Sequence, residues 1–499
     1  MELERSIPAS INYQDVLPVA VPAVARRRRF FPVNGTTFNP DGTNEIRIQL
    51  NSTNALLDPQ HSYLEFEVVN NNAAATFGFD IGGAHVLFDE VRVEQGGRVL
   101  AREQAHNRLH AGILASAQVN TDGMATESVS QGQRFTASAA GGNAGQIAPV
   151  GATLGLAYVS QVHNSNLQVP AGGVVRMCMA MPTGLFTQDK LIPLPLVSQS
   201  DPITLVLNMC RSEAVGSWSA APANSDIVIR RISYCSQLIE VGRDVIDQIK
   251  MMREMGGGQL TISSTDIEHS SALLVNTSTG ETPIRIPMRK KSIKSLLFQI
   301  NSTDLTQGAA GMNLSQLMNL SYGGNANMDS YQMKVGSVVY PPTPIQCWGN
   351  VGRAAGIALP LPNQERGECA MELAKALGSL GFVNPTGRLS GIAYGVSTAA
   401  AIALGNPALA DGDNGDGVNT VATIGNEEQS VCPFGLDLQS FQHTAIESGV
   451  DTETMALETT LLLNINAVTA GLENRNVHTY LLYDQHYYFN ADGSVTISN

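Results

Sequence analysis

The sequence predicts an all-β chain made of two consecutive domains of the sandwich or jelly-roll type. Short segments in which polar and apolar residues alternate recur along the chain, few segments have helical spacing, and Gly-rich stretches interrupt the strands. Alternation with a period of two places one face of each strand on a core. The length of 499 residues favours two domains, because single cores rarely grow beyond about 250 to 300 residues.

The composition favours a protein that associates with other subunits. Charged residues make up 15% of the chain, well below the roughly 25% of an average globular domain. The net charge of −14 means that the chain as a whole repels nucleic acid and anionic membranes, so any contact with a genome would be local. The six cysteines form no C-x-x-C pair, and we interpret them as core thiols from a reducing compartment.

Residues 1–37 are predicted to form an extended N-terminal arm. This segment has no sustained hydrophobic period and contains several prolines, which suits a chain that becomes ordered only against a partner. It holds the most concentrated basic element of the sequence, Arg26, Arg27, Arg28 and Arg29. These arginines could bind phosphates of a genome or an inner membrane surface, pair with acidic residues of a neighbouring subunit, or have no specific role.

The first domain is expected over residues 38–240. The dipeptide Asp58-Pro59 predicts a turn, Gly96-Gly97 ends a strand, and helical spacing begins near Ala101 and continues to Ala117. A stretch rich in Gly, Ala, Ser and Thr, at about 120–155, is interpreted as an insertion. A helix over 241–255, ended by three glycines, marks a linker at 241–258. Strands are predicted at 44–50, 62–68, 91–95, 174–180, 203–208 and 227–234.

The second domain, over residues 259–499, repeats the plan of the first. Ile284-Arg285-Ile286 echoes Ile46-Arg47-Ile48, and the segment 459–465 echoes 202–209 in the same order. Two echoes in order indicate a duplicated domain. A second Gly-rich insertion is expected at about 395–428, a helix at 368–377, and strands at 477–489 and 494–498.

Six stretches carry a family resemblance through their order and spacing: Leu87 to Leu100, Leu191 to Leu196, Tyr331 to Ile345, Gly435 to Leu438, Ser448 to Thr452 and Asp492 to Ile497. The chain resembles the double jelly-roll major capsid proteins of double-stranded DNA viruses, the lineage of adenovirus hexons, tectiviruses, virophages and polinton-like viruses. The resemblance covers roughly residues 38–499. It implies two consecutive eight-stranded jelly-roll barrels with a few short helices and long loop insertions.

The resemblance also implies a function that is structural. Such a chain would form pseudohexameric homotrimers that tile an icosahedral shell, would be located in the virion and would assemble inside the host cell. Minor capsid or cement proteins, and a penton protein at the vertices, are the implied partners. The two insertions would face outward, and no cofactor is implied.

A search for chemistry identifies no catalytic, cofactor-binding or metal-binding residues. The motifs G-x-S-x-G, G-x-x-x-x-G-K-[ST] and H-E-x-x-H are absent. His106 and His110 lie four residues apart on a predicted helix, but the sequence indicates neither a third ligand nor a supporting carboxylate, so we interpret them as packed or solvent-exposed. The acidic loop from Asp411 to Asp416 resembles a calcium loop without its glutamate, since the twelfth position is Ala422; its ion binding stays open.

Two other classes of protein share this architecture. A two-domain β-sandwich that binds carbohydrate or attaches to surfaces is the main alternative. The lack of a secretion signal and the aromatic content of 6% count against it. A glycoside hydrolase on a jelly roll would need two carboxylates that face each other across a cleft, a pairing that sequence does not reveal.

Overall fold

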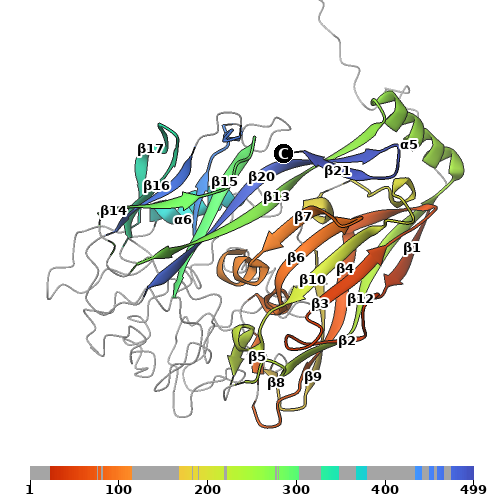
Figure 1. Cartoon of the computed structure of the whole chain (residues 1–499), viewed down its shortest axis with the longest axis horizontal. Coiled ribbons are helices and arrows are strands. Elements are labelled where there is room, and N and C mark those ends of the chain that lie inside the picture. The colour runs from red at the N-terminus through yellow and green to blue at the C-terminus, as the bar shows by residue number, and fades with distance from the viewer. Residues whose placement is uncertain are drawn as a thin grey trace, which may run out of the picture.

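A computed structural model describes residues 23–75, 77–79, 82–114, 168–181, 184–188, 190–218, 222–275, 278, 280–302, 328–347, 367–378, 433–440, 449–453, 458–465 and 474–498. Within them the chain forms two β-barrels, and the pair of long strands β13 and β20 runs from one end of the molecule across to the second barrel (Figure 1). Both predicted insertions, 120–155 and 395–428, lie outside the described residues. None of the described helices is long and apolar enough to cross a membrane.

The first barrel has the strand order of a jelly roll. Its two sheets have the orders β1-β12-β4-β9 and β3-β10-β6-β7. When the eight main strands are counted along the chain, these orders are 1-8-3-6 and 2-7-4-5, the double Greek key that defines a jelly roll. The strands are β1 (Ala23–Phe30), β3 (Glu45–Leu50), β4 (Ala55–Asn70), β6 (Phe88–Gln95), β7 (Arg98–Gln104), β9 (Val174–Ala180), β10 (Ile203–Met209) and β12 (Ile227–Val241).

The second barrel repeats this order strand for strand. Its sheets are β13-β20-β15-β18 and β14-β19-β16-β17, which again give 1-8-3-6 and 2-7-4-5. The predicted fold class, two consecutive jelly rolls, is therefore confirmed. The strands are β13 (Gln259–Leu274), β14 (Gly280–Ile286), β15 (Ile293–Ser302), β16 (Met328–Val335), β17 (Val338–Gln346), β18 (Phe434–Asp437), β19 (Thr459–Ile465) and β20 (Arg475–Asn490), with β21 (Val495–Ser498) paired to β20.

The echoes in the sequence fall on equivalent strands of the two barrels. The Ile-Arg-Ile segments lie in β3 and β14, the second strand of each barrel, and the other pair lies in β10 and β19, the seventh. The hairpins β6–β7 and β16–β17 are equivalent too. Gly96 and Gly97 have φ values of 55° and 79°, and Gly336 has 60°, so tight turns with left-handed residues close both hairpins.

Shorter elements connect the strands. Helix α5 (Arg243–Met255) stands between β12 and β13, where a helix was predicted, and lies at one end of the molecule (Figure 1). A small sheet has the order β11-β5-β8, and β2 pairs with β12. These minor elements are β2 (Thr37–Phe38), β5 (Phe77–Phe79), β8 (Gln168–Val169), β11 (Gly216–Trp218), η2 (Gly83–Leu87), α1 (His106–Arg108), η3 (Leu109–Leu114), α4 (Gly184–Thr187), η5 (Leu194–Leu196), η6 (Ser212–Ala214) and α6 (Gly367–Gly378).

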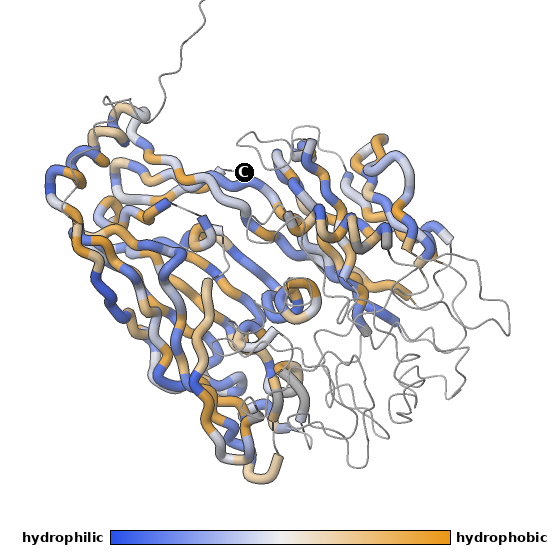
Figure 2. Tube along the Cα trace, turned by 180° about the vertical axis from the view of Figure 1, so that it is seen from behind, coloured by the Kyte–Doolittle hydropathy of each residue, from blue (hydrophilic) through white to orange (hydrophobic). Residues whose placement is uncertain are grey.

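Three apolar clusters hold the barrels together. Each barrel encloses its own core, and Tyr487 and Phe489 of β20 belong to the core of the first barrel. A third cluster joins Leu109 and Ile113 of η3 to Tyr480 and other side chains of the second barrel. Apolar positions alternate with polar ones along the sheets (Figure 2). The barrels therefore share buried surface instead of being linked only by α5.

Two local predictions were wrong. Residues 101–104, expected to be helical, belong to β7, because the Gly96-Gly97 turn folds this segment back onto β6; helical structure begins only at His106. The dipeptide Asp58-Pro59 lies inside β4. The register with β12 shifts there, so the Asp58 side chain caps a bulge by accepting the N–H of Gln60 at 3.2 Å.

Candidate functional site

The four arginines lie on β1, at the outer edge of the first sheet. Residues Ala23 to Phe30 pair antiparallel with Val241 to Tyr234 of β12. The described part of the predicted arm is therefore not an arm: it contains the first strand of the barrel, and residues 1–22 lie outside the description. Positive charge on an edge strand discourages uncontrolled pairing with other strands. It also leaves four exposed arginine side chains in a row, which a partner molecule can contact.

On one face of this sheet, charged side chains from four strands gather. We call this surface the basic face. Arg29 pairs with Glu65 at 2.6 Å, and Arg27 lies 3.8 Å from the same carboxylate. Arg26 pairs with Glu240 instead, at 3.1 Å. The residues of the basic face are Arg27, Arg29, Tyr63, Glu65, Glu67, Arg176, Arg230 and Arg231.

Glu67 is the best-bound carboxylate of the basic face. It accepts hydrogen bonds from Arg176 at 2.8 Å, Arg230 at 3.0 Å and Arg231 at 3.1 Å. These bonds, the one from Arg176 above all, lower the pKa of Glu67 to about 2. Five arginines surround two glutamates here, so this surface is positive on a chain that is acidic overall. Sequence reasoning identified only the β1 arginines, because the others come from β9 and β12.

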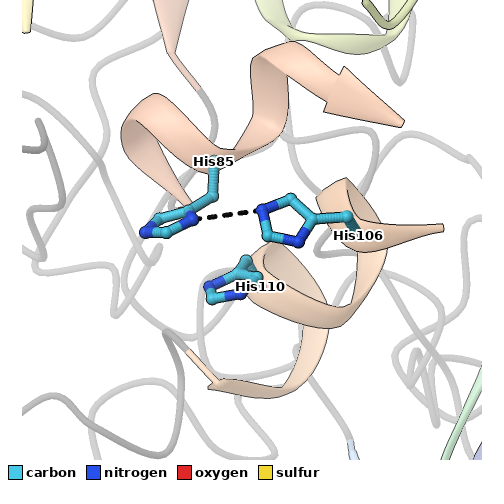
Figure 3. A group of neighbouring side chains, drawn as sticks. All are labelled: His85, His106 and His110. Atoms are coloured by element: carbon cyan, nitrogen blue, oxygen red, sulfur yellow. Dashed lines mark hydrogen bonds between the residues drawn. The ribbon is translucent and has the colours of Figure 1, made fainter. Parts of the chain in front are cut away.

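The second notable site is a buried cluster of three histidines, which we call the histidine cluster. His85 lies on η2, His106 on α1 and His110 on the π-helical turn η3, and all three are buried. Figure 3 shows the imidazoles facing one another between the two helical segments. Nδ1 of His85 lies 3.2 Å from Nε2 of His106, and the rings of His85 and His110 stack with centroids 3.9 Å apart.

A buried carboxylate adjoins the histidine cluster. Oε1 of Glu103, at the end of β7, lies 3.1 Å from Nδ1 of His106 and 3.9 Å from Nε2 of His110. The side chain of Glu103 is 2% exposed. Among the described residues, neither carboxylate oxygen has a hydrogen-bond partner with acceptable geometry.

The sequence reveals only half of this cluster. The spacing of His106 and His110 indicated a shared face, and the structure brings them together as expected. His85 and Glu103, the missing third imidazole and the supporting carboxylate, were not recognised. His85 precedes β6 and Glu103 lies near the end of β7, so the antiparallel hairpin of these strands places both residues at the same end of the hairpin. No spacing motif encodes that. The acidic loop at Asp411 to Asp416 lies outside the described residues.

Comparison with solved structures identifies the fold. The chain is similar to VP54 of PBCV-1, with a TM-score of 0.56 and 10% identity. The match covers 98% of this chain and 99% of the other, whose structure was fitted into a reconstruction of the virophage Sputnik. The Faustovirus major capsid protein matches with a TM-score of 0.53 and 9% identity over 93% of this chain and 90% of the other. A structure of the Sputnik virophage matches with a TM-score of 0.50 and 10% identity over 100% of this chain and 93% of the other.

The class of fold is thereby defined: this chain has the double jelly-roll architecture found in viral major capsid proteins. No protein-family model matches the sequence, and no curated protein is similar to it. At such low identity the shared feature is the path of the backbone.

Proposed function

We propose that this chain is a structural major capsid protein that forms pseudohexameric homotrimers and tiles an icosahedral virus shell. The observation that carries the proposal is the repetition of one strand order in both halves of the chain. Three copies then provide six similar barrels around a threefold axis. Repeated contacts between the edges of such units generate a closed lattice. The function would be self-association within the virion, without a catalytic step.

The partners follow from the geometry of a shell. A lattice of six-sided units needs a different protein, a penton, at its fivefold vertices, and minor capsid or cement proteins would occupy the gaps between capsomers. The insertions at 120–155 and 395–428 would face outward. Assembly would take place inside the host cell.

We further propose that the basic face contacts a neighbouring capsid subunit. Its five arginines outnumber its glutamates, whereas the chain as a whole carries a net charge of −14. Outside this face another copy of the chain is therefore acidic on balance, and complementary charge favours and orients such a contact. Genome phosphate and an inner membrane surface are the other anionic partners that this face would accept.

The oligomeric state of the purified chain tests the main proposal. We expect a stable particle of three times 53.0 kDa in analytical ultracentrifugation or native mass spectrometry, over a wide range of concentration. A monomer at every concentration would contradict the proposal. A two-domain surface-binding protein would give that result.

Charge reversal tests the basic face. The double change Arg27→Glu and Arg29→Glu should leave trimers intact but prevent their association into larger arrays, measured by light scattering and electron microscopy. The matched control is Arg289→Glu, which changes an exposed arginine of the second barrel. Arrays that form normally from the double variant would refute the contact. Normal shells that lose their nucleic acid would show that the genome is the partner instead.

A further inference from the structure

The spacing of the histidine cluster matches what a metal ion requires. One nitrogen from each imidazole can be chosen so that all three lie within 4.8 Å of one another. In a tetrahedral zinc site with Zn–N bonds of about 2.0 to 2.1 Å, the ligand nitrogens are about 3.3 Å apart. Nδ1 of His85 and Nε2 of His106, 3.2 Å apart, already have this separation. His110 stacks against His85 from the adjacent turn, and its nitrogen lies within 4.8 Å of the other two.

The burial of three polar rings at one place also needs an explanation. His85, His106 and His110 are each at most 5% exposed. Three buried imidazoles packed against one another cost desolvation energy that apolar side chains at the same place would avoid. A bound cation would compensate for this cost.

Glu103 makes the case for a cation stronger. A buried carboxylate is costly unless a counter-charge or several hydrogen bonds stabilise it. Oε1 of Glu103 lies on the Nδ1 side of His106, whereas Nε2 of the same ring faces His85. A metal ion bound at Nε2 would polarise the ring and orient the Nδ1 proton toward Glu103. This is the carboxylate–histidine–metal arrangement that supports protein metal sites.

The local backbone is shaped to bring these groups together. Ala105, between Glu103 and His106, has a φ of 49°, which non-glycine residues rarely adopt. The following turn, η3, is π-helical, and such turns are rare and often found at functional sites. Together they redirect the chain from β7 so that His106 and His110 point at His85.

We propose that His85, His106 and His110 bind a transition-metal ion at the junction of the two barrels, with Glu103 supporting His106. Three imidazoles suit zinc and its neighbours in the first transition row, whereas calcium and magnesium prefer oxygen ligands. The other side of the same segment packs on the second barrel through Leu109, and the Tyr480 hydroxyl donates to the Ala105 carbonyl at 3.2 Å. A bound ion would thus hold rigid the segment that joins the barrels, whatever the chain assembles into.

Metal content tests the proposal directly. The full chain, produced with zinc in the medium and then dialysed, should contain about one zinc ion per chain, measured by inductively coupled plasma mass spectrometry. His85→Gln, His106→Gln and His110→Gln should each lose it. The matched control is His478→Gln, which removes a buried histidine from a stacked pair, His269 and His478, that lies outside this three-histidine group; it should keep its zinc.

Two further measurements keep the test decisive if a variant folds poorly. Cobalt added to the metal-free wild type should give the visible absorption bands of tetrahedral Co²⁺, and zinc should displace them. A chelator should lower the melting temperature of the wild type, and zinc should restore it. A wild type that takes up neither ion, and whose melting temperature does not respond, would overturn the proposal and leave the contact between His106 and Glu103 as the reason why these side chains converge.

Discussion

Replacing Glu67 by Gln should make the protein less stable at neutral pH and flatten its acid unfolding. The native contacts with the three arginines lower the pKa of Glu67 from 4.5 to about 2. A carboxyl with a depressed folded-state pKa stabilises the fold above its unfolded pKa, and that stability is lost as the pH falls toward the folded pKa. The relevant window therefore runs from pH 4.5 down to about 2.

The size of the effect follows from the shift. A change of this extent corresponds to about 3 kcal/mol in the free energy of unfolding. The guanidinium groups are well exposed, between 43% and 72%, so solvent and salt screen part of this, and we expect about 2 kcal/mol at neutral pH. More than half of that contribution should be gone by about pH 3, because the unfolded carboxyl is then mostly protonated.

Urea unfolding at several pH values measures this prediction. Glu67→Gln should be about 2 kcal/mol less stable than the wild type at pH 7, and the two should converge toward pH 3. Glu281→Gln, which changes an exposed carboxylate on β14, is the control and should track the wild type throughout. The reasoning is refuted if the difference between Glu67→Gln and the wild type is the same at pH 7 and pH 3.

Three other changes probe the packing and the buried charge. Leu109→Ala, at a fully buried position between the barrels, should lower the free energy of unfolding by about 2 to 5 kcal/mol, measured by urea unfolding; a loss below 1 kcal/mol would show that η3 does not join the barrels. Gly435→Ala places a methyl group 2.9 Å from Leu373 and Ala376 of α6 and should lower the free energy of unfolding by about 1 to 3 kcal/mol in the same assay. An unchanged stability would contradict this prediction. Burial raises the pKa of Asp266 from 3.8 to about 7, so this carboxyl makes the fold less stable as the pH rises from about 4 to 7. Asp266→Asn should therefore remove this fall of the melting temperature with pH. An unchanged pH dependence of the melting temperature would contradict the raised pKa.

The strands that alternate could be predicted from the sequence, and those that do not alternate could not. β3 alternates polar and apolar residues strictly, and its predicted position, 44–50, agrees with the structure. β1 carries arginine on both faces because it is an edge strand with one pairing partner, so it has no apolar period to reveal it. The bulge at Asp58-Pro59 imitates a turn in sequence, since the same residue types serve both purposes.

The two sites were harder to predict because their residues meet only after folding. The basic face takes side chains from β1, β4, β9 and β12, which are adjacent in the sheet but far apart in sequence. The histidine cluster needs the β6–β7 hairpin to bring His85 and Glu103 to the residues that follow β7. What the sequence did carry, the spacing of His106 and His110, was too common a pattern to identify a site by itself.

Electron microscopy of the purified oligomer tests the central claim most directly, because it shows how the barrels are arranged. If the chain is a capsid subunit, averaged images should show threefold particles with six upright barrels, two from each chain, in a pseudohexagonal outline. Particles with a single pair of barrels, or oligomers without threefold symmetry, would contradict the account.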